Sequence, residues 1–234
     1  MAIEIKGFIT NTLLDWEGYI SAEIFLAGCN FRCPYCHAKA LVLEPNKLET
    51  IDKVEVIKYL NLNKKWIDGL VICGGEPTIH KDLPEFIKEF KNHGIKIKLD
   101  TNGSNPKMLS DLLQNKLIDY IAMDIKAPLN QEQYSKIVNS KIAVNDIIKS
   151  VNILMNSNIN YEFRTTVSKV LTSFDDLREI GKAIKGAKRY RLQKFVKRDD
   201  AILDNSLPSE NYREDEFEQI CDELKKYVSD CKYR

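Results

Sequence analysis

Six short apolar segments alternate with amphipathic segments along most of the chain. Each apolar segment is too short for a typical helix, and each is rich in β-branched, aromatic or aliphatic residues. Such runs are typical of strands that a sheet buries on both faces. The predicted strands are residues 22–26, 70–73, 95–100, 120–124, 161–167 and 190–196.

The segments between the predicted strands have the apolar spacing of helices. Leu83, Phe86, Ile87 and Phe90 recur at helical spacing, and Gly94 follows where the helix should end. Asn105, with Pro106 next to it, and Ser173 are expected N-terminal caps. The same spacing predicts further helices over residues 105–113, 144–155, 173–184 and 217–228.

Strands that alternate with helices predict an α/β fold with right-handed crossovers and a parallel sheet. The periodicity leaves an open doubly wound sheet and a barrel as alternatives, and both gather ligands at the carboxyl ends of the strands. Without a Ser/Gly-rich linker or a change in composition, we predict one domain over residues 1–234. Its core should cover about residues 20–200, with a C-terminal helix at about 210–230.

Composition restricts the classes of partner. The chain has 35 basic and 34 acidic side chains, so its net charge of +1 gives no broad electrostatic attraction to nucleic acid or to an anionic membrane. No apolar run approaches the roughly 18 residues that a bilayer span needs. The first residues lack the layout of a secretion signal. We therefore expect a cytoplasmic protein whose cysteines are reduced.

Three of the six cysteines lie close together after the predicted strand 22–26. Cys29, Cys33 and Cys36 occupy one short loop, where three thiolates can converge on a single metal centre. One interpretation is a zinc site completed by His37. The other is a [4Fe–4S] cluster with three protein ligands and one open iron. The cluster is favoured, because structural zinc sites usually take their ligands as two pairs on separate turns.

The triplet, with the aromatic Tyr35 before Cys36, resembles the signature of the radical S-adenosylmethionine (radical SAM) enzymes. This resemblance implies a partial (β/α)6 TIM-like barrel with the cluster loop after its first strand. It also implies two cofactors, a [4Fe–4S] cluster and S-adenosylmethionine (SAM), with SAM bound to the open iron. In the family, the reduced cluster cleaves SAM to a 5′-deoxyadenosyl radical that abstracts hydrogen from a substrate. Tyr35 would lie beside the adenine.

The second predicted strand runs into Gly74, Gly75, Glu76 and Pro77. Two glycines allow close approach of the backbone, and the Glu76 carboxylate can accept hydrogen bonds from an ammonium group. The resemblance implies that this loop binds the SAM amino group. Cys73 stands before the glycines where the family usually has threonine. Its thiol is either within reach of the cluster or a small buried hydrophobe.

Polar residues also mark the ends of the other strands. Asp100, Thr101 and Asn102 follow the third strand, where the family faces the SAM ribose or methionine. Asp124 and Lys126 lie on one side of an extended segment, either facing the cavity or forming a surface ion pair. Arg164 suits a carboxylate, although a structural salt bridge is an equal alternative. The candidates for SAM binding at these ends are Asp100, Thr101, Asn102, Asp124, Lys126, Arg164 and Gln193.

From about residue 15 to residue 128, the chain resembles one subgroup, the activating proteins of the anaerobic ribonucleoside-triphosphate reductase. Glu17 stands where this subgroup usually has proline, and Ala38-Lys39 stands where Asn-Pro is common. The resemblance implies that the chain generates a glycyl radical on the reductase, with a low-potential electron donor such as flavodoxin or ferredoxin. The matching stretches are Asp15-Trp16-Glu17-Gly18, the cysteine loop to His37, residues 74–78, residues 99–106 and residues 123–128.

Two other functions remain as alternatives. One is a radical SAM enzyme that acts on a small molecule or peptide, for example in deazapurine synthesis. The other is a non-catalytic zinc-binding module. Of the remaining cysteines, we expect Cys221 in the core and Cys231 exposed near the C-terminal end. The basic run at residues 182–198 is either a solvated face or a docking surface.

Overall fold

The computed structural model describes residues 3–198 and 202–234. The described residues form two compact units. The first unit contains residues 3–30, 38–101 and 107–121. The second unit contains residues 31–37, 102–106, 122–198 and 202–234. The prediction of one domain over residues 1–234 stays a prediction.

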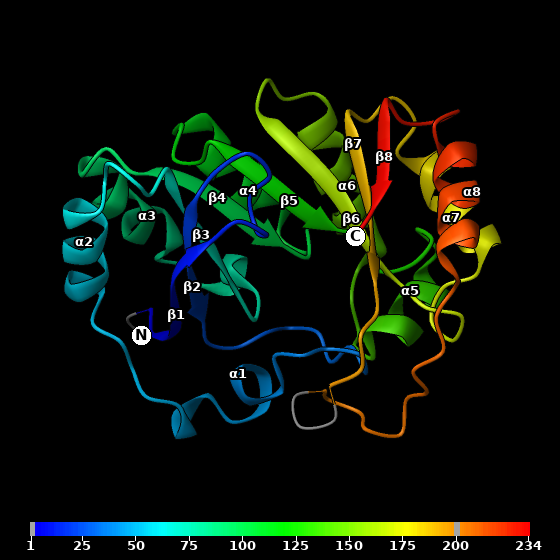
Figure 1. The fold of residues 1–234 in the computed structure, drawn as a ribbon, viewed down its shortest axis with the longest axis horizontal. Coiled ribbons are helices and arrows are strands. Elements are labelled where there is room, and N and C mark those ends of the chain that lie inside the picture. Colours follow the sequence, from blue (N-terminus) through cyan, green and yellow to red (C-terminus); the bar gives the residue numbers. More distant parts are fainter. Residues whose placement is uncertain (1–2, 199–201) are drawn as a thin grey trace. The chain divides into compact units, whose positions relative to one another are not determined.

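The first unit is built on four strands that lie side by side in chain order (Figure 1). β1 (Ile5–Thr12) pairs antiparallel with β2 (Ser21–Leu26). β2, β3 (Gly69–Gly74) and β4 (Lys96–Thr101) pair in parallel. The apolar side chains that alternate along β2 to β4 are fully buried, as in Ile24, Ile72 and Leu99. Alternation then places the intervening residues, including Glu23, Cys73 and Lys98, on the opposite face of this sheet.

The helices of the first unit begin and end where the sequence provides caps. α2 (Lys53–Leu62) begins at Asp52, whose carboxylate accepts a hydrogen bond from the Val54 amide. α3 (Leu83–Asn92) buries the predicted apolar stripe, and Gly94 follows with a φ of +74°. The remaining helical segments are α1 (Lys39–Leu43), the 3-10 turns η1 (Pro45–Lys47) and η2 (Pro77–Ile79), and α4 (Pro106–Gln114).

In the second unit, β6 (Asn160–Val167), β7 (Arg189–Lys194) and β8 (Asp230–Tyr233) pair in parallel. β5 (Tyr120–Asp124) begins in the first unit and ends in the second. Ser173 caps α7 (Phe174–Ala183) as predicted, and it forms a capping box with Asp176. The helices are α5 (Gln131–Val138), α6 (Val144–Met155), α7 (Phe174–Ala183) and α8 (Glu214–Leu224).

All six predicted strands occur, and the structure adds β1 and β8. The sequence did not predict β1, because several of its residues are polar and exposed. It did not predict β8, because that strand has only four residues. The expectation that Cys231 is exposed is wrong. This side chain is only 3% exposed, because β8 pairs with β7 and packs against α8. The C-terminal helix also ends earlier than predicted, at Leu224.

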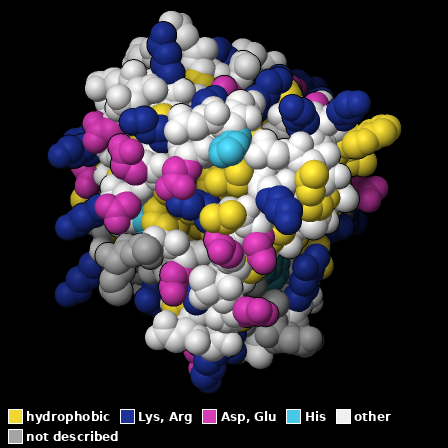
Figure 2. Space-filling model, turned by 90° about the vertical axis from the view of Figure 1, so that its left-hand side faces the viewer, with side chains coloured by type: hydrophobic (Ala, Val, Ile, Leu, Met, Phe, Trp, Pro, Cys, Tyr) yellow, Lys and Arg dark blue, Asp and Glu magenta, His cyan; other side chains and the backbone are white. Residues whose placement is uncertain are grey.

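The face of the molecule drawn in Figure 2 shows no large region of a single charge. Lys and Arg side chains alternate with Asp and Glu on the face of the first unit that carries α2 (Figure 2). This mixture agrees with the balanced composition of the chain. Among the described residues, no helix has the length and apolarity needed to cross a membrane.

Candidate functional site

The cysteine loop of the second unit is held in place from two sides. On one side, the Arg32 amide donates to the Val138 carbonyl at the end of α5, at 2.9 Å. On the other side, the segment 203–204 donates two backbone hydrogen bonds to the loop, each 2.9 Å, to the carbonyls of Pro34 and Cys36. The Cys36 amide itself donates to the Cys33 carbonyl at 3.0 Å. These contacts fix the spacing of Cys33 and Cys36 through the backbone.

Cys33 and Tyr35 are buried beside a lysine. Burial raises the pKa of the Cys33 thiol to about 11, and the nearby Lys126 ammonium opposes this rise. The Tyr35 hydroxyl is buried, and among the described residues no group hydrogen-bonds to it. Burial, and then the neighbouring Cys33, hold the pKa of Tyr35 well above its usual range. The Lys126 ammonium lies 5.9 Å from the centre of the Tyr35 ring.

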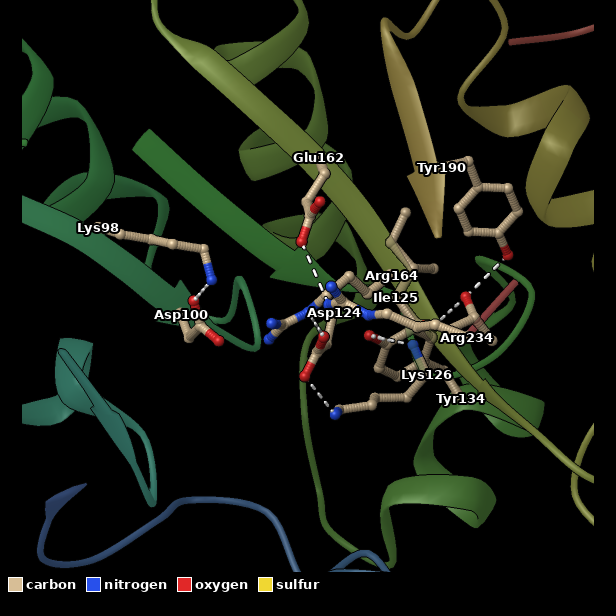
Figure 3. Close-up of polar contacts among 11 residues, drawn as sticks. Lys98, Asp100, Asp124, Ile125, Lys126, Tyr134, Glu162, Arg164, Tyr190 and Arg234 are labelled. Carbon is tan, nitrogen blue, oxygen red and sulfur yellow. Dashed lines mark hydrogen bonds and ion pairs between the residues drawn. The ribbon is translucent and has the colours of Figure 1, made fainter. Parts of the chain in front are cut away.

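Three of the predicted site residues form one partly buried network (Figure 3). The Asp124 carboxylate accepts a hydrogen bond from Lys126 Nζ at 2.8 Å and one from Arg164 Nε at 2.7 Å. Burial alone would raise the pKa of Asp124, but the charges of Arg164 and Lys126 outweigh it and lower the pKa. Likewise, burial tends to lower the pKa of Lys126, but Asp124 raises it above its usual value. The sequence proposed a surface ion pair as one alternative, and the structure shows a partly buried pair instead, with side chains 14% and 20% exposed for Lys126 and Asp124.

The loop after β3 in the first unit fixes a carboxylate. Glu76 is 1% exposed, and its Oε1 accepts hydrogen bonds from the Thr78 amide at 3.0 Å and from Thr101 Oγ1 at 2.6 Å. The Thr78 hydroxyl donates to the same oxygen. Pro77, also buried, begins the turn η2. The structure therefore brings two predicted residues, Glu76 and Thr101, into direct contact.

The two glycines of this loop allow the chain to pack against its own backbone. The Gly75 amide donates to the Leu26 carbonyl at 3.0 Å, and a Cβ at Gly75 would lie 1.7 Å from the Gly28 oxygen. Gly74 has a φ of +117°, a conformation that other residues rarely adopt. Gly74 and Gly75 thus let the end of β3 pack against the end of β2 and against Gly28, the residue that precedes Cys29.

A second polar cluster lies on the face of the first unit's sheet that carries Glu23. The Cys73 thiol donates to Glu23 Oε1 at 3.0 Å, and Lys98 pairs with Asp100. Burial raises the pKa of Glu23 to about 7, and burial also raises the pKa of Cys73 well above its usual range. Sequence reasoning missed Glu23 and Lys98 as site residues. The signal was present, since each is a charged residue inside a predicted strand.

Two further predicted residues are Asn102 and Gln193. Asn102 is buried, and its Oδ1 accepts a hydrogen bond from the Ser104 amide at 2.9 Å. Gln193 is half-buried on β7, where it lies opposite Thr166 of β6. The described contacts leave the predicted SAM-binding roles of both residues as predictions.

The three cysteines of the triplet form no disulfide within the described residues, and they are divided between the two units. Cys29 belongs to the first unit, whereas Cys33 and Cys36 belong to the second. Within residues 3–198 and 202–234, no three His, Cys, Asp or Glu side chains form a group that could hold a metal ion. The triplet as a complete ligand set therefore stays a prediction.

Comparison with known proteins identifies the family. Residues 24–190 match the family described as the Radical SAM superfamily. The chain is also 31% identical over 232 residues to the protein MJ1227 of Methanocaldococcus jannaschii. That protein has the inferred name of glycyl-radical enzyme activating enzyme. This match covers 96% of the chain and 92% of the relative. The chain therefore belongs to the radical SAM superfamily, and it is a radical SAM enzyme.

Other matches cover smaller parts of the related proteins. An inferred GTP 3′,8-cyclase of Methanococcus maripaludis (strain C5) is 31% identical over 159 residues, which are 65% of this chain and 53% of the relative. The crystal structure of Streptococcus suis SuiB superposes with a TM-score of 0.67 at 14% identity, over 89% of this chain and 47% of SuiB. This likeness is one of fold. It confirms the predicted α/β fold of the partial TIM-like barrel class.

Enzymes of this superfamily use a [4Fe–4S] cluster and SAM, so the predicted cofactors are confirmed. The donors in the second unit fit a cluster chemically. Cys33 and Cys36 carry thiol groups on a loop that backbone hydrogen bonds hold, and the Lys126 ammonium opposes the rise that burial causes in the pKa of Cys33.

Proposed function

We propose that this enzyme cleaves SAM reductively and generates a glycyl radical on an anaerobic ribonucleoside-triphosphate reductase. The observation that carries the proposal is the match to MJ1227, which extends over nearly the full length of both chains. The name of that relative supports a glycyl-radical enzyme as substrate. The sequence stretches between residues 15 and 128 support the reductase as the particular target. The proposed electron donor is a flavodoxin or a ferredoxin.

In this proposal, Cys29, Cys33 and Cys36 hold three irons of the cluster. When bound, the cluster and SAM supply the electron and the radical that removes hydrogen from a glycine Cα. The chain itself holds two of these ligands in position before any iron binds, through the hydrogen bonds from Arg32 and residues 203–204. Such preorganisation is what a site needs to retain ligand geometry.

The proposed SAM contacts follow from the chemistry of the fixed side chains. Glu76 presents a carboxylate, fixed by the hydroxyls of Thr78 and Thr101, which suits the ammonium group of SAM. The Asp124 carboxylate fixes Lys126 and Arg164, so the positions of both cations are set before a ligand binds. The other residues proposed to bind SAM are Tyr35, Gly74, Gly75, Pro77, Asp100, Asn102 and Gln193.

A second candidate function is a radical SAM reaction on a small molecule. The similarity to a GTP 3′,8-cyclase favours it. That match, however, covers 53% of the relative, whereas the match to MJ1227 covers 92% of the relative, so we prefer the activase. The non-catalytic zinc-binding alternative fails, because the chain belongs to a superfamily of enzymes.

The experiment combines the anaerobically reconstituted enzyme, a reductant, SAM and the candidate reductase. We expect a glycyl radical in the electron paramagnetic resonance spectrum, with 5′-deoxyadenosine formed only in the complete mixture. Cys33→Ala should abolish both products. Cys221→Ala, which alters a cysteine outside the loop, should retain them. If GTP replaces the reductase and is consumed, while the reductase gives no radical, the small-molecule function is correct and the activase proposal is wrong.

A further inference from the structure

The second unit contains a pair of cysteines that the proposed function does not use. Cys221 lies on α8 and Cys231 on β8, and both side chains are buried, with 5% and 3% exposed. α8 packs against β8 (Figure 1), and the rings of Phe217 and Tyr233 stack with centroids 5.3 Å apart. β8 is in turn paired with β7, where Cys231 lies opposite Tyr190. The helix and the strand are thus held in one arrangement, and the two cysteines with them.

The two cysteines are neighbours and share a pocket. Phe217, one helical turn before Cys221, stacks on Tyr233, two residues after Cys231, so the packing of α8 on β8 brings the two cysteines to neighbouring positions. Both cysteines line a pocket of about 380 Å³, together with acidic and lysine side chains of α8, its C-cap and β8. The charges around the pocket are mixed, with Asp222 and Lys225 paired at 2.7 Å. This pocket is the route by which a small uncharged reagent would approach the two cysteines.

The two thiols differ in pKa. The interaction with Cys231 lowers the pKa of Cys221, with a smaller contribution from Lys225, and these effects outweigh burial. The interaction with Cys221, followed by burial, raises the pKa of Cys231. Since the thiolate is the nucleophile in disulfide exchange, Cys221 is the group that attacks first.

We propose that Cys221 and Cys231 form a reversible dithiol–disulfide pair that reacts with small uncharged disulfides entering this pocket. The Cys221 thiolate attacks one sulfur of the reagent RS–SR, which forms a mixed disulfide and releases RS⁻. Cys231 then loses its proton to water, and its sulfur attacks the Cys221 sulfur, which releases the second RS⁻. The two cysteines are oxidised, and the reagent is reduced to two thiols.

The disulfide would fasten the last strand to the last helix. It would close the short loop between residues 221 and 231 and keep β8 paired with β7. A cross-link over so short a loop is expected to raise the melting temperature, by roughly 5–10 °C. This inference does not depend on the cluster, on SAM or on the proposed substrate.

The test treats the reduced chain with bis(2-hydroxyethyl) disulfide, blocks the remaining thiols by alkylation, and maps disulfides by peptide mass spectrometry. We expect a peptide pair that joins residues 221 and 231 in most molecules, and we expect dithiothreitol to reverse it. Cys231→Ser should accumulate the mixed disulfide on Cys221. Cys221→Ser should leave Cys231 largely unmodified over the same time. Cys73→Ala serves as a matched control, and it should form the cross-link like the unaltered chain.

Wild-type mapping alone can overturn the proposal, because it needs no variant to fold. A chain whose other cysteines are oxidised while residues 221 and 231 stay reduced would contradict it. Equal modification of Cys231 in the Cys221→Ser variant would contradict the order of attack. An oxidised chain that melts at the same temperature as the reduced chain would contradict the fastening of β8.

Discussion

Two carboxyl groups have opposite electrostatic surroundings: the partly buried Asp124 in the second unit and the buried Glu23 in the first. Asp124 contacts two cations, Lys126 and Arg164, and they lower its pKa. Glu23 accepts a hydrogen bond from the Cys73 thiol, and burial raises its pKa to about 7. The comparison teaches that burial by itself favours the neutral acid, and that the two cations in contact with Asp124 reverse this effect.

The difference assigns different roles to the two groups. Asp124 is a permanent negative charge that orders Lys126 and Arg164 in a network of candidate cofactor-binding residues. Glu23 gains and loses a proton near neutral pH, and the nearby acids Asp15 and Asp100 add to the rise of its pKa. Lys98 acts in the opposite direction but is paired with Asp100. The first cluster is therefore a rigid anchor, and the second is a titrating site.

The largest expected effect comes from removing the charge of the anchor. Asp124→Asn leaves Lys126 and Arg164 buried without the carboxylate that balances them. Breaking a buried ion pair from one side costs about 3–5 kcal/mol. We expect a loss of this size in the free energy of unfolding, measured by urea denaturation at pH 7.

The matched control for this prediction is Glu44→Gln, which breaks the exposed pair between Glu44 and Lys47. Exposed pairs contribute about 0–1 kcal/mol, so this variant should unfold nearly like the unaltered chain. Equal losses in Asp124→Asn and Glu44→Gln would show that the Asp124 network does not act as a buried anchor.

The second effect depends on pH. Because the folded chain holds the proton of Glu23 more tightly than the unfolded chain, its free energy of unfolding should fall as the pH rises from about 4.5 to 7. The loss attributable to Glu23 is at most about 3 kcal/mol. Glu23→Gln carries no titrating proton, so it should gain stability relative to the unaltered chain across this range, with no further gain above about pH 8. Urea denaturation from pH 5 to pH 8 measures the difference.

Glu49→Gln provides the control, because Glu49 is exposed. Its difference from the unaltered chain should be small and should not follow pH in this range. A Glu23→Gln variant whose difference is also independent of pH would mean that Glu23 is already charged in the folded chain, like Asp124.

The smallest effect concerns the hydrogen bond that Cys73 donates. The hydrogen bond from Cys73 lowers the pKa of Glu23, so Cys73→Ala should raise that pKa. The pH-dependent loss in the free energy of unfolding should then extend to higher pH. A hydrogen bond of this kind contributes about 1 kcal/mol. Cys73→Ser keeps a donor and should behave like the unaltered chain in the same pH series. If both variants show the same pH dependence, the thiol is not a partner of Glu23.

Local patterns predicted the parts of the fold that depend on neighbouring residues. The apolar runs of β2 to β7 and the capping box of Ser173 and Asp176 are visible within a few positions. β1 and β8 are not, since one is partly polar and the other is short. The burial of Cys231 depends on the packing of β8 against α8 and on its pairing with β7. The residues next to Cys231 in the sequence do not reveal these contacts.

The candidate site was predictable as a set of residues but not as a set of contacts. The Gly-Gly-Glu-Pro loop and the residues Asp124, Lys126 and Arg164 were identified from their places at strand ends. Their pairing was not, because Arg164 reaches Asp124 across 40 positions. Glu23 and Cys73 are separated by 50 positions in the same way. Whether a buried charge is balanced depends on such distant partners, which periodicity does not reveal.

The central claim is that Cys29, Cys33 and Cys36 hold a [4Fe–4S] cluster with one iron open to SAM. Its most direct test is metal and sulfide analysis after anaerobic reconstitution. Electron paramagnetic resonance spectra of the reduced protein are then recorded before and after SAM is added. The account predicts about four irons and four sulfides per chain, a spectrum that SAM alters, and loss of both in each single Cys→Ala variant of the triplet. A single zinc ion per chain, with a spectrum that SAM leaves unchanged, would contradict it.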